Sequence, residues 1–466
     1  MILLDKGIIV TSGKEAVGTI VIEGEKILDV LYADADDYSY NIYKYMKSQP
    51  EIVDIEGMYV MAGGIDGHVH FREPGLTHKG DMATESLAAL AGGVTSVIDM
   101  PNTIPATTSA AALKEKLDIA AEKGNVRIAF HIGATNSNTD EICRLVTSGD
   151  SETGIRPEDI AGVKVFMGSS TGNMLVDESE TLDRLFKIKE KPVLVHCEDE
   201  KTIQENLAAA KEKYGEDIPF SEHEHIRSRK ACIKSSIKAL EMAMKHGTRL
   251  VLCHISTKEE LEMVRAAKAI NPAIMAETSC NYLWFTDEDY DRLGSKVKCN
   301  PSIKTADDRT ALRAALAEGL IDVIGSDHAP HLETEKGNTY CKAPSGLPSI
   351  QQTLSVLLTI ASEEDIPLTR IASVFSENAA ETYNMDRGRI APGYAADLVI
   401  FDYAKEFKVT ADDQYSKCGW TPYDGELLKG YIERVLINGH TVLKDGKIIE
   451  QDRYGRPLES GRISDR

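Results

Sequence analysis

The chain has 466 residues, of which 42% are hydrophobic and 27% are charged, a balance typical of globular proteins. Its formal net charge of −21 argues against a nucleic-acid partner, because binding to phosphates needs clustered Lys and Arg. The sequence shows no signal peptide and no apolar window of membrane length, so we expect a cytoplasmic protein without a membrane partner. The length fits one large α/β barrel with a smaller module.

The eight cysteines are scattered singly, and none forms a Cys-x-x-Cys pair. We expect free thiols, as in a reducing compartment. Cys197 and Cys253 each adjoin a histidine within an apolar run. Neighbours on a strand face opposite sides, so if these histidines point into a site, the two cysteines are expected to pack as small apolar residues rather than to act as ligands.

Both ends of the chain contain short strand patterns. The clearest are Ile8–Val10, Thr19–Ile22, Ile27–Val30, Ala396–Phe401 and Val435–Gly439. After the third of these, Asp34–Pro50 is predicted to be a polar insertion. We therefore predict one small β-sandwich domain that is built from both termini, residues 1–60 and 388–466.

Residues 61–387 alternate apolar strand patterns with helical patterns. After a first strand at 60–70, strands are predicted at 93–98, 126–131, 162–166, 192–196, 249–254, 273–277 and 322–327. Helices are predicted at 109–123, 180–189, 232–245, 258–269 and 308–318. Eight such units favour a (β/α)8 barrel of the TIM type, with parallel strands and right-handed crossovers. A doubly wound open sheet is the competing fold, but no Gly-x-Gly-x-x-Gly follows an early strand.

His68 and His70 lie two residues apart at the end of a strand, where positions i and i+2 face one side. Two imidazoles on one side can bind one metal ion. Other polar residues end or follow later strands: Asn102, Lys164, His196, His254 and Asp327. The spacing assigns the last four to strands 4, 5, 6 and 8, and the ends of parallel barrel strands share one mouth.

Each of these residues also has a purely structural interpretation. His196 and His254 could be half-buried residues with satisfied hydrogen bonds, and Asp327 could cap the next segment. Lys164 is harder to explain in this way, because an inward lysine must be paired or neutralised. Carboxylation by carbon dioxide is one solution, since the resulting carbamate can bridge two divalent ions. The whole set then suits a two-metal site.

Seven motifs carry a resemblance to a known family. They are Gly64–His70, Met100–Thr103, Val163–Phe166, Val195–Glu198, Cys253–Ser256, Gly325–His331 and Gly388–Asp397. In their order and spacing the chain resembles the amidohydrolase superfamily, in the cyclic-amide branch that includes dihydroorotases, allantoinases and hydantoinases. The resemblance runs along most of the chain.

The resemblance implies two zinc ions, although cobalt or manganese also suit such ligands. The implied metal ligands are His68, His70, Lys164, His196, His254 and Asp327. The His-x-His pair and the aspartate would hold the more buried ion, and carboxylated Lys164 together with a hydroxide would bridge the two ions. Asp327 would be the catalytic residue that takes the hydroxide proton and passes it to the leaving ring nitrogen.

Within the branch, the segment His68–Gly75 is most similar to dihydroorotases. Their substrate ring carries a carboxylate, which a guanidinium can bind through two hydrogen bonds. By resemblance, Arg72, Asn102 and His331 bind this carboxylate, and Asn300 contacts the ring. Allantoinases and hydantoinases typically lack the arginine. From the residues alone, Arg72 could equally form a surface ion pair, and the asparagines could belong to turns.

The implied reaction is the reversible hydrolysis of dihydroorotate to N-carbamoyl-L-aspartate, a step of pyrimidine synthesis. An allantoinase or hydantoinase and a non-catalytic scaffold relative are the alternatives. A homodimer is expected by analogy, and association with aspartate carbamoyltransferase is left open. His331–Gly346 is predicted to form a loop over the site. The chain departs from the family pattern at Asn281, Ser302 and Ser345, which leaves its substrate range open.

Overall fold

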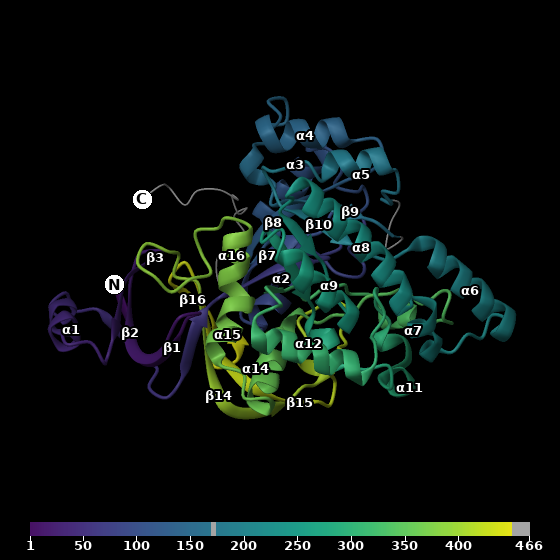
Figure 1. Cartoon of the computed structure of the whole chain (residues 1–466). Helices are drawn as coiled ribbons and strands as arrows, with labels where there is room; N and C mark the ends of the chain where they lie inside the picture. Colours follow the sequence, from purple (N-terminus) through teal and green to yellow (C-terminus); the bar gives the residue numbers. More distant parts are fainter. Residues whose placement is uncertain (169–173, 450–466) are drawn as a thin grey trace.

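Eight parallel strands form the barrel at the centre of the molecule (Figure 1). The computed structural model describes residues 1–168 and 174–449. Strands pair with their neighbours in chain order, and Val69 bridges to His328 beyond the last strand, so the two ends of the sheet meet. The barrel strands are β6 (Gly64–Val69), β7 (Val94–Asp99), β8 (Arg127–Gly133), β9 (Gly162–Phe166), β10 (Val193–His196), β11 (Leu250–Leu252), β12 (Ile274–Thr278) and β13 (Val323–Ile324). The predicted barrel is confirmed.

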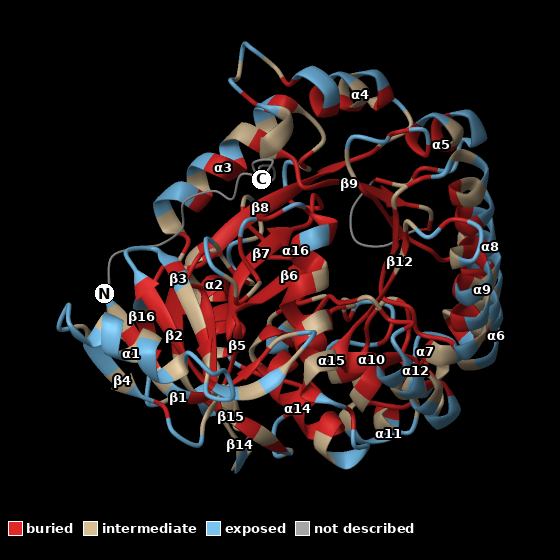
Figure 2. Ribbon diagram, turned by 60° about the vertical axis from the view of Figure 1, so that its left-hand side comes forward, coloured by how far each residue is buried: buried red, intermediate tan, exposed pale blue. Residues whose placement is uncertain are grey.

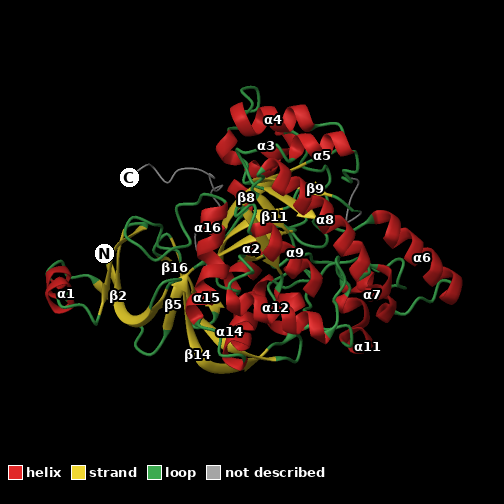
Figure 3. Cartoon of the chain, viewed as in Figure 1, coloured by secondary structure: helices red, strands yellow, loops and turns green. Residues whose placement is uncertain are grey.

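Helices connect the barrel strands and cover the outside of the barrel (Figure 3). Several of them begin at a side-chain cap; at α3, α6 and α9, for example, Ser109, Asp199 or Thr257 accepts a hydrogen bond from the backbone N–H three residues later. The helices after β6 are α2 (Met82–Ala91), α3 (Ala110–Lys123), α4 (Thr139–Ser148), α5 (Ser179–Leu185), α6 (Glu200–Tyr214), α7 (His223–Ile226), α8 (Arg229–His246), α9 (Lys258–Lys268), α10 (Cys280–Trp284), α11 (Asp289–Leu293), α12 (Ala306–Glu318), α13 (Glu333–Lys336), α14 (Thr353–Glu363), α15 (Leu368–Ala372) and α16 (Asn378–Thr382).

The barrel strands are buried on both faces (Figure 2). Along β10, Leu194 belongs to a small apolar cluster with other alternate strand residues, while Val193 and Val195 belong to the large cluster that includes the helices. This alternation places one set of side chains inside the ring of strands and the other beneath the helices. Burial on both faces explains why the strands appear in the sequence as continuous apolar runs.

A mixed sheet built from both ends of the chain accompanies the barrel. Its order is β17-β16-β15-β14-β5-β1-β2-β3, and β4 pairs with β1. The strands are β1 (Ile2–Val10), β2 (Glu15–Glu23), β3 (Lys26–Tyr32), β4 (Glu51–Asp54), β5 (Tyr59–Ala62), β14 (Leu398–Lys408), β15 (Leu427–Ile437), β16 (His440–Lys444) and β17 (Lys447–Ile448). β5 joins the two ends, because it pairs with β1 on one side and with β14 on the other.

The contribution of both termini to one β-rich unit is confirmed, and hydrogen bonds connect the expected sandwich into a single continuous sheet. The domain limits, residues 1–60 and 388–466 against 61–387, stay a prediction, and β5 (Tyr59–Ala62) runs across the first of them. In the described part of the chain, no helix has the length and apolar character needed to span a membrane.

The insertion Asp34–Pro50 contains a helix, α1 (Tyr38–Met46), that was not predicted. Tyr38, Ile42 and Tyr45 pack against a small cluster on the outer strands, and the Tyr45 hydroxyl donates a hydrogen bond to a carboxylate on β3 at 2.9 Å. The three positions follow the i, i+4, i+7 spacing of one helix face. This face consists of two tyrosines and one isoleucine in a segment rich in polar residues, which is why the sequence predicted only a polar insertion.

A buried ion pair joins α3 to the loops that follow β6 and β7. Asp99, the last residue of β7, accepts a hydrogen bond from the Phe71 backbone N–H at 2.7 Å. Its other oxygen pairs with the ammonium of Lys116, which also donates to the Met100 carbonyl at 2.9 Å. Both charged side chains are fully buried. The pair therefore ties the helix to the backbone that follows two neighbouring strands at the barrel mouth.

We expect Lys116→Met to lower the free energy of unfolding by about 3–5 kcal/mol, because it leaves the buried Asp99 carboxylate without its cation. Lys114→Met on the same helix is the matched control. Lys114 forms an exposed i, i+4 pair with Asp118, so its loss should cost less than about 0.5 kcal/mol. Urea titration followed by fluorescence measures both values. Equal losses in the two variants would contradict the structural role of the buried pair.

Candidate active site

One small cavity lies at the carboxyl ends of the barrel strands. It is lined by His68, His70, Lys164, Phe166, His196, His254, Asn300, Asp327, Ala329, Ser345 and Gly346. Its volume is about 20 Å³, which leaves room for about one water molecule. All six residues that the sequence analysis proposed as metal ligands line this cavity. The structure thus brings together side chains from five different barrel strands.

His68 and His70 face Asp327 across the cavity. The Nε2 atoms of the two rings lie 3.5 and 3.1 Å from Asp327 Oδ1. On the outer side, His68 Nδ1 donates to Glu277 Oε1 and His70 Nδ1 donates to Asn102 Oδ1, each at 2.7 Å. Because these oxygens hold the Nδ1 protons, both Nε2 atoms turn a lone pair toward Asp327. The three inner atoms lie within 4.8 Å of one another, close enough to share one ion.

His196 and His254 form the other half of the cluster. His196 Nε2 donates to Glu198 Oε2 at 3.0 Å, which leaves a lone pair on Nδ1. This Nδ1 lies 2.9 Å from His254 Nε2. Glu198 is in turn held by an ion pair with Arg227. Two imidazole nitrogens that converge at this distance, with an outer carboxylate orienting one of them, form a donor set that suits a cation.

The protonation states agree with metal binding. Burial lowers the pKa of His68, His196 and His254, so these rings are neutral at neutral pH, the form that binds metals. Burial alone would raise the pKa of Asp327, but its close contact with the His70 ring and the nearby charge of Lys164 bring it below its usual value. Asp327 is therefore a carboxylate that can act as a ligand or accept a proton.

Three residues at the site have left-handed backbone conformations. The φ angles are 67° for Arg72, 40° for His254 and 50° for Asp327. Such conformations cost a non-glycine residue of order 1 kcal/mol, so the surrounding contacts must hold them. Each follows the end of a strand, where the sharp turn directs the side chain into the mouth of the barrel.

Lys164 is fully buried on β9. Its Nζ lies 3.2 Å from Cys253 Sγ and 5.2 Å from the centroid of the Phe166 ring. Among the described residues, no carboxylate forms an ion pair with it. Cys253 and Cys197 are buried in apolar clusters as expected, but Cys253 also contacts the lysine, which its position next to a histidine did not predict.

Arg72 is buried beside the cavity, with 2% of its surface exposed. Its Nε donates to the Pro330 carbonyl at 3.0 Å, and its NH2 lies 3.0 Å from His331 Nε2. Burial lowers the pKa of the guanidinium to about 10, so it stays charged at neutral pH. No carboxylate in the described parts of the chain forms an ion pair with it. A buried charge without a counter-ion is costly, and an anionic ligand would supply the missing charge.

The remaining predicted contacts lie close by. Asn300 and Ser345 line the cavity, and Asn300 Oδ1 has no hydrogen-bond partner among the described residues. Asn102 reaches the site through its bond to the His70 ring, and its contact with substrate stays a prediction. Asn281 and Ser302 are buried away from the cavity, so of the three departures from the family pattern only Ser345 lies at the site.

The segment Ala329–Leu347 covers the cavity and contains the short helix α13. Its Lys336 donates hydrogen bonds to three backbone carbonyls at 3.0–3.1 Å. Trp420, in the connection between β14 and β15, donates from Nε1 to the His331 carbonyl at 2.7 Å. The predicted loop over the site is therefore anchored both from within and by the sheet built from the termini.

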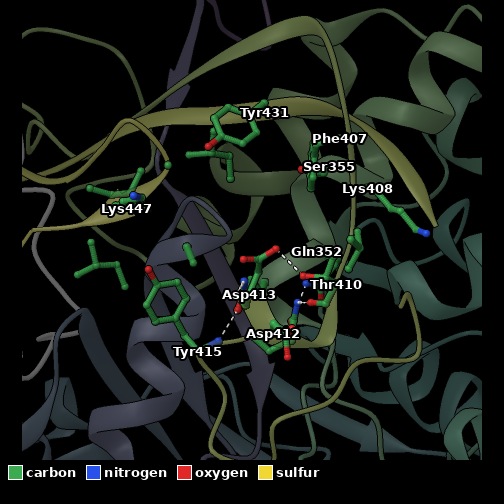
Figure 4. Close-up of a pocket in the computed structure, with 18 residues that line it drawn as sticks. Gln352, Ser355, Phe407, Lys408, Thr410, Asp412, Asp413, Tyr415, Tyr431 and Lys447 are labelled. Carbon is green, nitrogen blue, oxygen red and sulfur yellow. Dashed lines mark hydrogen bonds between the residues drawn. The ribbon is translucent and has the colours of Figure 1, made fainter. Parts of the chain in front are cut away.

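A larger cavity of about 600 Å³ lies elsewhere, beside the hairpin of β14 and β15 (Figure 4). Its polar side chains are bonded mainly to one another. Gln352 donates to Gln414 at 2.8 Å, Thr410 donates to Asp413 at 2.5 Å, and Gln351 accepts from the Tyr415 N–H at 3.0 Å. No metal-ligand cluster of the described residues lies there. The cluster in the barrel is the candidate active site.

Among the partners of the site residues, sequence reasoning selected Asn102 but not Glu198, Glu277 or Lys79. Glu198 could have been predicted, because it lies two residues after His196, and side chains at i and i+2 of an extended segment point to the same side. Glu277 ends a barrel strand, β12, and could have been chosen by the same rule as the ligands. Lys79 lies in a loop and contacts His331 at 3.0 Å, a pairing that no local pattern reveals.

A family model for the amidohydrolase family matches residues 59–442 of the chain. A dihydroorotase of Methanosarcina mazei is 33% identical over 90% of this chain and 91% of its own length. An allantoinase of Desulfitobacterium hafniense is 31% identical over 86% of this chain and 88% of its own length. The solved structure of an L-hydantoinase from Arthrobacter aurescens superposes with a TM-score of 0.88 at 26% identity, covering 98% of this chain and 99% of its own.

These similarities show that the chain belongs to the amidohydrolase family, in its cyclic-amide branch. The cluster of histidines and an aspartate at the barrel mouth is a site that could hold metal in such a protein. A carboxylate, Asp327, lies within it, and the buried guanidinium of Arg72 lies beside it.

We expect Glu277→Gln to weaken zinc binding about 10- to 100-fold, because the carboxylate holds the proton of the His68 ring on its outer nitrogen. Glu260→Gln is the matched control, since Glu260 is an equally buried carboxylate that hydrogen-bonds to Ser236 and Thr257 and to no histidine. Competition with a chromogenic chelator measures the affinity. A similar loss in both variants would mean that Glu277 acts through general stability rather than through the ring.

Proposed function

We propose that this protein is a dihydroorotase, which catalyses the reversible hydrolysis of the dihydroorotate ring to N-carbamoyl-L-aspartate. One observation carries the proposal: the Arg72 guanidinium is buried next to the histidine cluster without a carboxylate partner among the described residues. Dihydroorotate brings the anion that this position lacks. Allantoin and unsubstituted hydantoin carry no carboxylate. Relatives named dihydroorotase, at 30–34% identity, support the proposal.

The ring carboxylate is proposed to bind between Arg72 and His331. The guanidinium NH2 and the imidazole Nε2 lie 3.0 Å apart, so one carboxylate can contact both groups. Asn300, whose Oδ1 lacks a described partner, lies on the cavity wall where it can accept a hydrogen bond from a ring N–H. Asn102 is proposed to join them at the carboxylate through its amide nitrogen while its oxygen orients His70.

The donor set fits two divalent ions, which we propose to be zinc. One would be held by His68, His70 and Asp327, and the other by His196 and His254, whose inner nitrogens converge at 2.9 Å. Lys164 is proposed to be carboxylated, because a carbamate at this buried position replaces an ammonium that has no carboxylate partner among the described residues and lies in a cluster that would hold cations. The ions would supply Lewis acidity and lower the pKa of water.

Asp327 is the residue proposed to move the proton. Its Oδ1 faces the cavity between the two histidines, and its lowered pKa keeps it ready to accept a proton at neutral pH. A water oxygen adds to the ring carbonyl carbon as Asp327 takes the water's proton. The carbon–nitrogen bond then breaks, and the same proton passes to the leaving nitrogen. In the direction of ring closure the steps reverse, as pyrimidine synthesis requires.

The small cavity requires movement of its cover. About 20 Å³ holds about one water molecule and not a six-membered ring. The segment Ala329–Leu347, which forms one wall, would have to move for substrate to enter, and closure would then exclude water. A homodimer, a cytoplasmic location and an association with aspartate carbamoyltransferase stay predictions.

The test is turnover of L-dihydroorotate by the zinc-loaded protein, with dihydrouracil as the matched substrate because it has the same ring without the carboxylate. We expect dihydroorotate to be strongly preferred. Arg72→Met should raise its KM about 10- to 100-fold, as expected for losing a charged hydrogen bond, and leave dihydrouracil unaffected. Asp327→Asn should lower kcat by about 10²–10⁴ for either substrate. Removal of zinc by a chelator should abolish activity, and added zinc should restore it.

Other outcomes would assign the protein differently. Equal turnover of both rings would exclude the proposed role of the carboxylate. Preference for allantoin or hydantoin would make the protein a hydrolase of that type. A protein that binds zinc but opens none of these rings would be a non-catalytic member of the family.

A further inference from the structure

The His331 ring lies between two cations. Lys79 Nζ lies 3.0 Å from Nδ1, and Arg72 NH2 lies 3.0 Å from Nε2. The Nε2 atom also lies 3.1 Å from the carbonyl oxygen of Ser345. The ring is buried, with 2% of its surface exposed. Burial together with the nearby cations lowers the pKa of His331 far below its usual value, so the ring is neutral and carries a single proton.

The neighbours decide which nitrogen carries that proton. An ammonium has donors only, so Lys79 can bond to Nδ1 only if this nitrogen presents its lone pair. The proton is then on Nε2, where the Ser345 carbonyl accepts it until a substrate carboxylate takes its place. This tautomer satisfies the contacts of Lys79 and Ser345, whereas the other would satisfy only the contact of Arg72. It leaves the Nε2–H of His331 and the NH2 group of Arg72 as two donors 3.0 Å apart with no acceptor from the described residues between them. A carboxylate oxygen is the acceptor that both can share.

A nearby carboxylate favours the other tautomer. Glu335 Oε2 lies 3.9 Å from His331 Nδ1 and would attract a proton to that nitrogen. Nε2 would then be an acceptor for Arg72, and the two groups would satisfy each other instead of binding substrate. Lys79 opposes this arrangement because it occupies Nδ1 and pairs with Glu335 Oε1 at 2.9 Å.

We propose that Lys79 is a positioning residue that holds neutral His331 in the Nε2–H tautomer, so that His331 and Arg72 together donate to the substrate carboxylate. This inference rests on the proposed function for the identity of the carboxylate. The tautomer itself does not depend on any substrate.

The experiment combines two readouts. Nitrogen NMR of protein labelled at histidine, with the His331 signals assigned by their loss in His331→Asn, reads the tautomer without substrate. Kinetics with L-dihydroorotate read KM and kcat separately. In Lys79→Met we expect the proton to move to Nδ1 and KM to rise about tenfold, since a hydrogen bond to a charged group is lost, with kcat changed less than threefold. Lys79→Arg should retain the Nε2–H tautomer and most of the affinity.

Lys417→Met is the matched control. Lys417 binds the Thr77 carbonyl at 2.7 Å and Asp81 at 2.9 Å, so it supports the same loop without touching His331. It should leave the tautomer and KM unchanged. If Lys79→Met does not fold, Lys79→Ala serves in its place.

An Nε2–H tautomer that persists without Lys79 would overturn the inference, and so would a tautomer change that leaves KM unaltered. Failure of the wild-type protein to open dihydroorotate would instead overturn the proposed function. In that case the NMR result would still decide whether Lys79 controls the ring.

Discussion

The cluster at the barrel mouth depends on where three histidine protons are held. Glu277, Asn102 and Glu198 each accept an N–H on the outer side of a ring, so His68, His70 and His196 each turn a lone pair toward the centre. Without these bonds the same rings could rotate or exchange tautomers, and no strand geometry would prevent it. The parallel barrel brings the side chains together, and their outer hydrogen bonds orient the rings so that they could bind a metal.

Buried charge shapes the surroundings of the site in a related way. The Asp99–Lys116 pair is balanced and structural, and it secures the backbone next to the mouth. Arg72 directly follows Phe71, whose backbone N–H donates to Asp99, and it has no carboxylate partner among the described residues. The Asp99 carboxylate is thus neutralised within the fold, whereas the Arg72 guanidinium would be neutralised by a bound anion.

Much of the barrel and its cluster could be predicted from the sequence because both depend on local patterns. Apolar runs mark buried parallel strands, and a polar residue at the end of such a run must lie at the mouth. His68, Lys164 and His254 were placed correctly for this reason. Glu277 accepts a hydrogen bond from His68 although the two residues are 209 positions apart in the sequence, so no short sequence pattern links them. The helix α1 was missed because the face that packs on the sheet is formed by two tyrosines and one isoleucine that are only half-buried, next to several Asp and Lys residues.

The position of β5 has a consequence during synthesis on the ribosome. Its Tyr59–Ala62 backbone pairs with Leu398–Phe401 of β14, which is translated long afterwards, on the order of tens of seconds at typical rates. Until then the nascent chain carries an open strand edge next to an apolar stretch, a template for pairing with the wrong neighbour. The order of synthesis therefore leaves this edge unpaired for most of translation, a state that the finished sheet no longer shows.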